Sequence, residues 1–277
     1  MRPNRVKRAL RDGGVAFGTM VFEFGTTGIG QIAAAAGADF AIFDMEHTGW
    51  SIETIRSLMA TCRAVALVPM VRVPAIEYHL LSRPLDVGAM GLMAPMVESA
   101  EQARLMVWSA KYPPVGRRGA AFAVAHDDYA GGDVLTKMTI ANEEVMLIAQ
   151  IETAAGLDQV ERVAAVDGID VVWIGHWDLT VSLGISGKFD HPTYLAAVER
   201  IVAAAEAHGK AAGFMVTGVE TGADLLAQGY RCLAYSRDSR IYHDALKQGL
   251  DGLREAAETL ASRMPAPGRG LTRRGSS

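Results

Sequence analysis

The 277-residue sequence lacks the features that mark several classes of protein. It contains only two cysteines, Cys62 and Cys232, with no CxxC pair, which is typical of a reducing compartment and predicts a cytoplasmic protein. No run of about 18 apolar residues occurs, and the basic N-terminus leads into no apolar segment, so we expect no membrane partner and no export. Lysine and arginine form no basic stripe and the net charge is −4, which argues against a nucleic-acid partner.

Charged residues are also scarce, at 21% of the chain, whereas hydrophobic residues make up 50%. This composition excludes a disordered chain and leaves ample material for one large core. A length of 277 residues suits a single α/β domain. We therefore predict one domain over residues 1–263, followed by a disordered tail over 264–277 that is rich in Pro, Gly, Arg and Ser.

Short apolar runs alternate with Ala- and Leu-rich stretches of helical period, several of which end at a glycine. The strand candidates are residues 17–21, 40–43, 66–71, 91–95, 146–151, 171–174, 212–216 and 232–235. Each is too apolar to have one face in water, so the pattern predicts an α/β fold, a closed (β/α)8 TIM barrel. An open doubly wound sheet is the alternative, but no GxGxxG motif follows the first strand. The longer segment 111–140, rich in Pro and Gly, predicts an extended loop system beside one barrel mouth.

Active sites in such barrels lie at the C-terminal ends of the strands, and polar side chains follow four of the predicted strands. They are Asp44, Glu46 and His47, then Arg72, then Gln150 and Glu152, then His176 and Asp178. None is a lysine, which counts against a Schiff-base mechanism. The carboxylates Glu152 and Asp178 end neighbouring strands, where they could hold a hard divalent cation such as Mg²⁺ or Mn²⁺.

Five stretches carry a family resemblance, in the order and at the strand ends where the family has them. They are "FDMEH" (43–47), "VRVP" (71–74), "YPPVGRRG" (112–119), "QIET" (150–153) and "WIGHWDLTVSLG" (173–184). The sequence resembles the HpcH/HpaI aldolase family, metal-dependent class II pyruvate aldolases typified by 4-hydroxy-2-oxoheptanedioate aldolase, over roughly residues 10 to 260. The resemblance implies a barrel of the phosphoenolpyruvate/pyruvate type, a divalent cation (Mg²⁺, Mn²⁺ or Co²⁺), and cleavage or formation of a bond between pyruvate and an aldehyde.

The same resemblance implies a role for each strand-end residue. Glu152 and Asp178 would be the metal ligands, His47 the acid/base, and Arg72 the residue that binds the pyruvate oxygen, with Asp44 and Gln150 in support. Many members have "GPADL" where this chain has "GHWDL". Here Gly175, His176 and Trp177 would bind substrate through backbone N–H groups, in a narrower pocket. The chain also departs from the family pattern after Gly119, so the sequence does not identify the aldehyde substrate.

The chemistry of a 4-hydroxy-2-oxo acid agrees with these roles. Cleavage must remove the proton of the 4-hydroxyl group and hold the pyruvate enolate, which a cation at Glu152 and Asp178 can polarise as a Lewis acid. Arg72 would add positive charge where the enolate develops. We expect Asp44 to hold one imidazole nitrogen of His47, so that the other exchanges a proton. Strand alternation predicts that Glu46 points away from His47.

Simpler interpretations stand beside these. Glu152 could merely start a helix, Asp178 could be an N-cap, and Arg72 could be a plain ion-pair partner. Alternative functions are an oxaloacetate decarboxylase or macrophomate-synthase-like activity, and a citrate-lyase-like CoA thioester lyase. The latter needs a basic groove, and the sequence offers only Arg117 and Arg118. A metal-dependent small-ligand binding barrel is the non-enzymatic alternative.

The last predicted helix, residues 238–261, carries apolar residues at helical spacing along its whole length. We predict that it packs on another subunit and makes an obligate homo-oligomer. The family resemblance implies a homohexamer or a trimer in which this helix is exchanged between subunits.

Overall fold

The computed structural model describes residues 2–263, which divide into two compact units, one ending at Asp238 and one beginning at Ser239. The predicted tail over 264–277 lies outside the described residues, and a single domain reaching residue 263 stays a prediction. Within 2–263, no helix combines the length and the apolar character that crossing a bilayer requires.

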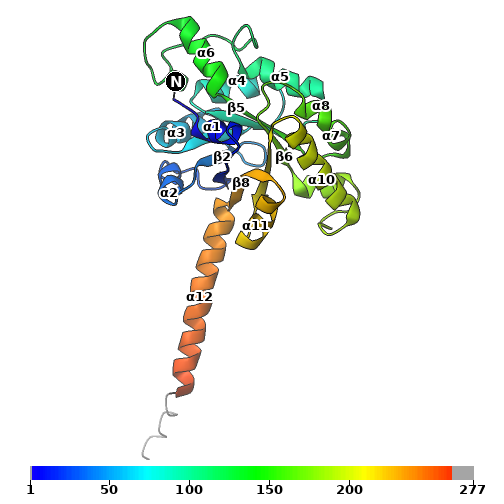
Figure 1. Ribbon diagram of the computed structural model, residues 1–277. Helices are drawn as coiled ribbons and strands as arrows, with labels where there is room; N and C mark the ends of the chain where they lie inside the picture. Colours follow the sequence, from blue (N-terminus) through cyan, green and yellow to red (C-terminus); the bar gives the residue numbers. More distant parts are fainter. Residues whose placement is uncertain (1, 264–277) are drawn as a thin grey trace, which may run out of the picture. The chain divides into compact units, whose positions relative to one another are not determined.

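The first unit is a closed barrel of eight parallel strands in the order of the sequence, which confirms the predicted (β/α)8 fold (Figure 1). The strands are β1 (Ala16–Val21), β2 (Phe40–Asp44), β3 (Val68–Arg72), β4 (Gly91–Ala94), β5 (Met146–Ile151), β6 (Val171–Ile174), β7 (Ala211–Val216) and β8 (Tyr230–Arg237). All eight predicted strands are present. The largest difference is at β8, which starts two residues earlier and ends two residues later than the pattern indicated.

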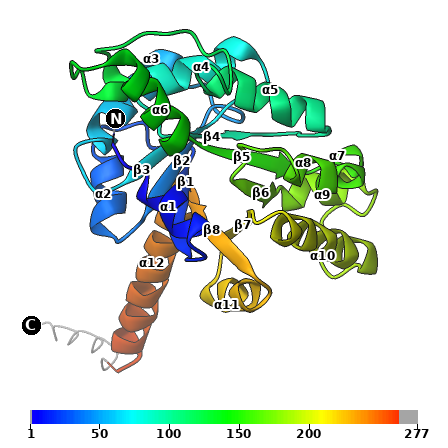
Figure 2. The ribbon, with the colours of Figure 1, turned by 45° about the horizontal axis from the view of Figure 1, so that its top comes forward.

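Helices alternate with the strands around the barrel (Figures 1 and 2). They are α1 (Arg5–Arg11), α2 (Ile29–Ala35), α3 (Ile52–Cys62), α4 (Tyr78–Asp86), α5 (Ala100–Ala110), the 3-10 turn η1 (Ala125–Asp127), α6 (Val134–Glu144), α7 (Ala154–Asp158), α8 (Val160–Ala164), α9 (His176–Ser182), α10 (Pro192–Ala207), α11 (Val219–Ala227) and α12 (Asp238–Arg263). The prediction of an extended loop over 111–140 is wrong from residue 134 onward, where α6 begins. Asp133 caps that helix, accepting from the Thr136 backbone N–H at 2.8 Å.

The inside of the barrel is packed solid by side chains from alternate strand positions. Buried residues on this inner side include Met20, Phe40, Met70 and Trp173. Position 18 requires glycine because the Phe40 ring packs directly against it. A Cβ at Gly18 would lie 2.4 Å from that ring. The alternate positions face the surrounding helices and form a separate, larger core.

Helix α1 and its cap Asn4 close the N-terminal end of the barrel, as their contacts with the segments just before β3 and β4 and with the start of β8 show. Arg5 donates to the Ala66 carbonyl at 2.8 Å and Asn4 to the Met90 carbonyl at 3.0 Å, while Arg231 donates to the Leu10 carbonyl at 2.6 Å. The opposite end, where the strands finish, is therefore the barrel mouth in which a site can form.

Two apolar surfaces are left exposed. On the outer wall of the barrel, Phe17 of β1 and Tyr235 of β8 are 49% and 45% exposed. Along α12, the exposed apolar residues are Ile241, Leu246, Leu250, Leu253 and Leu260. Strand faces of a parallel barrel are normally covered by helices, so an uncovered wall with aromatic side chains is unusual.

Candidate active site

The strand ends of β2, β3 and β5 bring four of the predicted site residues to the barrel mouth. Asp44, Arg72, Gln150 and Glu152 are all buried there, from 0% exposed for Asp44 to 6% for Arg72. Asp44 and Arg72 pair directly across β2 and β3, so both side chains point to the same side of the sheet. The structure thus brings together residues up to 108 positions apart in the chain.

Asp44 is the hub of the turn that follows β2. Its Oδ1 accepts from Arg72 Nε at 2.6 Å and from the Glu46 backbone N–H at 3.2 Å, and its Oδ2 accepts from the His47 backbone N–H at 3.0 Å. The prediction that Asp44 holds the imidazole of His47 is wrong. An aspartate that starts a turn bonds to the backbone two and three residues on, so Asp44 positions His47 through the main chain.

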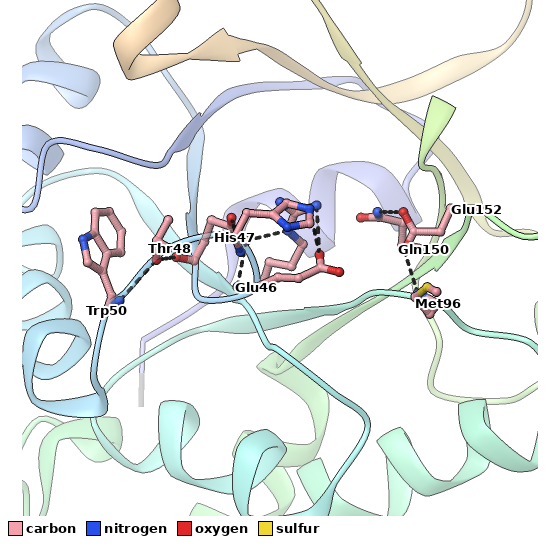
Figure 3. Close-up of polar contacts among 9 residues, drawn as sticks. Glu46, His47, Thr48, Trp50, Met96, Gln150 and Glu152 are labelled. Carbon is pink, nitrogen blue, oxygen red and sulfur yellow. Dashed lines mark hydrogen bonds and ion pairs between the residues drawn. The ribbon is translucent and has the colours of Figure 1, made fainter. Parts of the chain in front are cut away.

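Glu46 lies beside His47 rather than away from it (Figure 3). Its Oε2 is 3.7 Å from His47 Nε2 and 3.2 Å from Arg72 Nη1. The prediction from strand alternation is wrong because β2 ends at Asp44, and the following turn no longer alternates. Burial raises the pKa of Glu46, with a further rise from Asp44 and Asp178 and an opposing effect of Arg72. The His47 side chain is 54% exposed, so it can reach substrate or water.

Two carboxylates hold the Arg72 guanidinium group in place, and one of its nitrogens remains available to a ligand. Its Nε and Nη1 face Asp44 and Glu46, and its guanidinium carbon lies 5.3 Å from the centroid of the Phe22 ring. Nη2 has no hydrogen-bond partner among the described residues. A buried guanidinium donor without a partner is suited to an anionic oxygen of a ligand.

Glu152 is oriented by two hydrogen bonds (Figure 3). Its Oε1 accepts from the Met96 backbone N–H at 2.7 Å, and its Oε2 accepts from Gln150 Nε2. Met96 has a φ of 53°, a left-handed conformation that a non-glycine residue rarely adopts. Burial raises the pKa of Glu152, the two hydrogen bonds oppose that rise, and Glu46 and Asp178 add to it.

The simpler interpretations of the two predicted metal ligands do not describe this structure. Helix α7 begins after Thr153, whose hydroxyl caps the Gly156 N–H at 3.0 Å, so Glu152 is not its cap. Helix α9 begins after Gly175, which places Asp178 in its first turn without a capping bond. A Cβ at Gly175 would lie 2.2 Å from Glu152 Oε2, so only glycine lets β6 end beside that carboxylate.

His176 and Trp177 pack into an aromatic cluster with Phe214 and Phe189, which belong to the helix-facing core and which the sequence analysis did not single out. His176 stacks on Phe214 at 4.8 Å with an interplanar angle of 25°, and Trp177 meets Phe189 edge-on at 4.9 Å. Burial lowers the pKa of His176 to about 4, so this ring is neutral near pH 7. Phe22 and Met96 escaped prediction because apolar residues that follow a strand resemble the core in sequence.

Glu46 and Asp178 lie close enough to Glu152 to raise its pKa, and Asp178 also raises the pKa of Glu46, with Arg72 as the neighbouring cation. Within the described part of the chain, no group of three or more His, Cys, Asp or Glu side chains could hold a metal ion. The donor set therefore does not form a closed site. Two carboxylates do fit Mg²⁺ or a similar hard cation, which keeps several waters or substrate oxygens as ligands.

The fold and this mouth define a barrel enzyme with carboxylate and arginine chemistry at its strand ends. The profile of the family described as HpcH/HpaI aldolase/citrate lyase matches residues 20–245, and the chain belongs to this family, as its motifs predicted. Both activities in that description break carbon–carbon bonds, and the protein is an enzyme of the carbon–carbon lyase class.

Three known proteins illustrate the similarity. The 2-keto-3-deoxy-L-rhamnonate aldolase of Escherichia coli K12 is 34% identical over 247 residues, covering 89% of this chain and 92% of that protein. An HpcH/HpaI aldolase from Desulfitobacterium hafniense DCB-2 has a TM-score of 0.86 at 30% identity, covering 90% and 96% of the two chains. Macrophomate synthase has a TM-score of 0.79 at 26% identity and covers 90% of each chain.

The contact between Gly175 and Glu152 yields a prediction. Gly175→Ala should displace the Glu152 and Gln150 side chains, because the added Cβ has no room. We expect kcat/KM for carbon–carbon cleavage to fall about 100-fold, the loss typical of a misplacement of roughly 1 Å. Gly28→Ala is the matched control, since a Cβ there meets nothing within 4 Å. Unchanged activity in the Gly175 variant would show that Glu152 has no fixed role.

Proposed function

We propose that the protein is a metal-dependent class II aldolase that cleaves or forms 4-hydroxy-2-oxo acids through a pyruvate enolate. The observation that carries the proposal is one barrel mouth that combines a buried, doubly hydrogen-bonded Glu152 with an Arg72 fixed by two carboxylates. The substrates would be pyruvate and an aldehyde, and the reaction would run in the cytoplasm. The aldolase name of a relative at 34% identity supports the reaction type.

Glu152 and Asp178 would hold the divalent cation, Mg²⁺, Mn²⁺ or Co²⁺, with water and substrate oxygens as further ligands. When bound, the cation supplies a Lewis acid to the 2-oxo and carboxylate oxygens of pyruvate. Positive charge fits this place, because Glu46, Glu152 and Asp178 repel one another there. Gln150 and the Met96 N–H fix the direction of the Glu152 carboxylate, the usual task of groups that surround a metal ligand.

Arg72 would stabilise the enolate oxygen. Its Nη2 has no hydrogen-bond partner within residues 2–263, and Asp44 and Glu46 fix the rest of the guanidinium group. A donor that is already in position spends no energy on reorientation as the enolate charge develops. Asp44 therefore contributes by positioning Arg72, in addition to positioning the His47 main chain.

His47 would move the proton of the 4-hydroxyl group. Its imidazole is half-exposed at the mouth, and Glu46 Oε2, at 3.7 Å from Nε2, can stabilise the protonated ring. The aldehyde and pyruvate would lie against Gly175, His176 and Trp177. Since His176 is neutral near pH 7 and its ring stacks on Phe214 of the helix-facing core, it would contribute its backbone N–H rather than a charge.

The two alternative lyase activities fit the residues less completely. An oxaloacetate decarboxylase or macrophomate-synthase-like enzyme would use the same enolate step but would leave His47 without a hydroxyl proton to move. A CoA thioester lyase would need the two arginines of the "GRRG" motif for phosphates. Arg117 instead stacks over Trp108 at 5.7 Å, and Arg118 pairs with Asp86 at 2.6 Å. The non-enzymatic alternative does not agree with membership of a lyase family.

Exchange of the pyruvate methyl protons with deuterium tests the enolate step directly. We expect NMR to show exchange with Mg²⁺, Mn²⁺ or Co²⁺ present, its loss on treatment with a chelator, and its return when the metal is added back. Exchange that persists in the chelated protein would contradict the metal dependence. Absence of exchange with every metal would contradict the proposed function itself.

Variants of His47 and Glu152 should separate the two halves of the reaction. Glu152→Ala is expected to abolish both enolisation and C–C cleavage, because it removes a metal ligand. His47→Ala should slow cleavage of a 4-hydroxy-2-oxo acid about 10²- to 10⁴-fold while methyl exchange and oxaloacetate decarboxylation stay close to wild type. Equal losses on both substrates would assign His47 to positioning of the metal or of pyruvate.

The exposed apolar surfaces support a homo-oligomer, a hexamer or a trimer. Phe17 and Tyr235 on the barrel wall, and the stripe along α12, remain in water in a single chain. We expect light scattering to show an oligomer, and Leu253→Glu, on a side chain that is 69% exposed, to lower the mass. Glu255→Gln, on the same helix, should leave the mass unchanged. A wild-type monomer would refute the assembly.

A further inference from the structure

A bulge in β8 changes the direction of its last side chains. Ala16 and Gly18 of β1 pair with Cys232 and Ala234 of β8, but the next pair is Met20 with Arg237, so β8 has one extra residue. Ser236, inside this bulge, has a φ of 53°, which is a strained backbone for serine. The Thr19 hydroxyl bonds the Tyr235 carbonyl there at 3.0 Å.

The extra residue turns Arg237 toward the inside of the barrel. Without a bulge, alternation from Cys232 and Ala234 would send residue 237 to the outer wall. With the bulge, Arg237 pairs with Met20, whose side chain lies inside the barrel. The contact of its guanidinium carbon with the Phe22 ring, 5.6 Å from the centroid, agrees with this direction.

Arg237 is close to the Arg72 end of the candidate site. Both guanidinium carbons lie over the same Phe22 ring, at 5.3 Å for Arg72 and 5.6 Å for Arg237. Their separation is therefore no greater than the sum of those two distances. Phe22 is itself anchored, because the Asp238 carboxylate accepts from its backbone N–H at 3.0 Å and from the Phe24 N–H at 2.7 Å.

The two arginines differ in their partners. Arg72 is buried and faces Asp44 and Glu46. The Arg237 side chain is exposed, and across residues 2–263 this side chain forms no hydrogen bond or ion pair. A strained strand end thus holds an arginine without a counter-charge beside an enolate-binding arginine that is already neutralised.

We propose that Arg237 selects the aldehyde substrate by binding an anionic group, a carboxylate or a phosphate, at the end of the molecule away from the reacting carbon. This inference rests on the proposed aldolase function and deepens it. Pyruvate would occupy the Arg72 side, so an aldehyde joined to it extends across Phe22 toward Arg237. Arginine matches both oxyanions as a fork of donors.

Matched pairs of aldehydes test the proposal in the full-length enzyme with its divalent cation and pyruvate. The carboxylate pair is 4-oxobutanoate and 4-oxobutanamide, and the phosphate pair is glyceraldehyde 3-phosphate and glyceraldehyde. We expect the wild type to prefer the charged member of at least one pair, which identifies the group. Arg237→Gln should lower kcat/KM for that aldehyde about 10- to 100-fold, mainly through KM, and leave its neutral partner unchanged.

Two controls keep the outcomes distinct. Arg237→Lys should restore part of the preference, and Arg11→Gln, on a side chain 71% exposed at the closed end of the barrel, should change nothing. Wild-type indifference to charge, or equal losses on both members of a pair, would overturn the role of Arg237. Loss of pyruvate methyl exchange in the Arg237 variants, with exchange intact in the wild type, would also overturn the role of Arg237. Absence of methyl exchange in the wild type would overturn the aldolase function together with this inference.

Discussion

The buried ion pair between Asp44 and Arg72 is the contact on which the geometry of the barrel mouth depends. It joins directly paired residues of β2 and β3, with side chains 0% and 7% exposed. Loss of one partner would leave an uncompensated buried charge, which costs roughly 3–5 kcal/mol. The same Asp44 carboxylate bonds the backbone of Glu46 and His47, so the arginine, the glutamate and the histidine are all positioned from one side chain.

Charge balance at the mouth follows from that arrangement. Arg72 pairs with both Asp44 and Glu46, and among residues 2–263 no basic side chain forms a salt bridge with Glu152 or Asp178. Two protein hydrogen bonds orient Glu152 but do not remove its charge, and its raised pKa reflects the burial that remains uncompensated. A cation bound here would offset that repulsion, which is the electrostatic argument for the metal that we propose at Glu152 and Asp178.

The fold could be predicted from the sequence because each strand of a parallel barrel is buried on both faces. The eight strands therefore appear in the sequence as eight apolar runs. The strand-end positions of Asp44, Arg72, Gln150 and Glu152 followed from the same pattern. The direction of Glu46 did not, since it depends on a turn rather than on strand alternation. Helix α6 was not predicted because a Gly-rich stretch precedes it. The inward direction of Arg237 depends on a bulge that is visible only in the register between β1 and β8.

Backbone strain marks the two places at the mouth where sequence patterns gave no guidance. Met96 follows β4 with a positive φ and directs its N–H at Glu152, while Ser236 has a positive φ inside β8 and turns Arg237 inward. Such conformations cost of order 1–3 kcal/mol each and persist only where surrounding contacts enforce them. One strained residue thus fixes a carboxylate, and the other turns inward the arginine that we propose distinguishes one aldehyde from another. Because neither strained residue bonds to Asp44 or Arg72 in the described structure, the proposed acceptor side can change while the groups proposed to handle pyruvate keep their bonds.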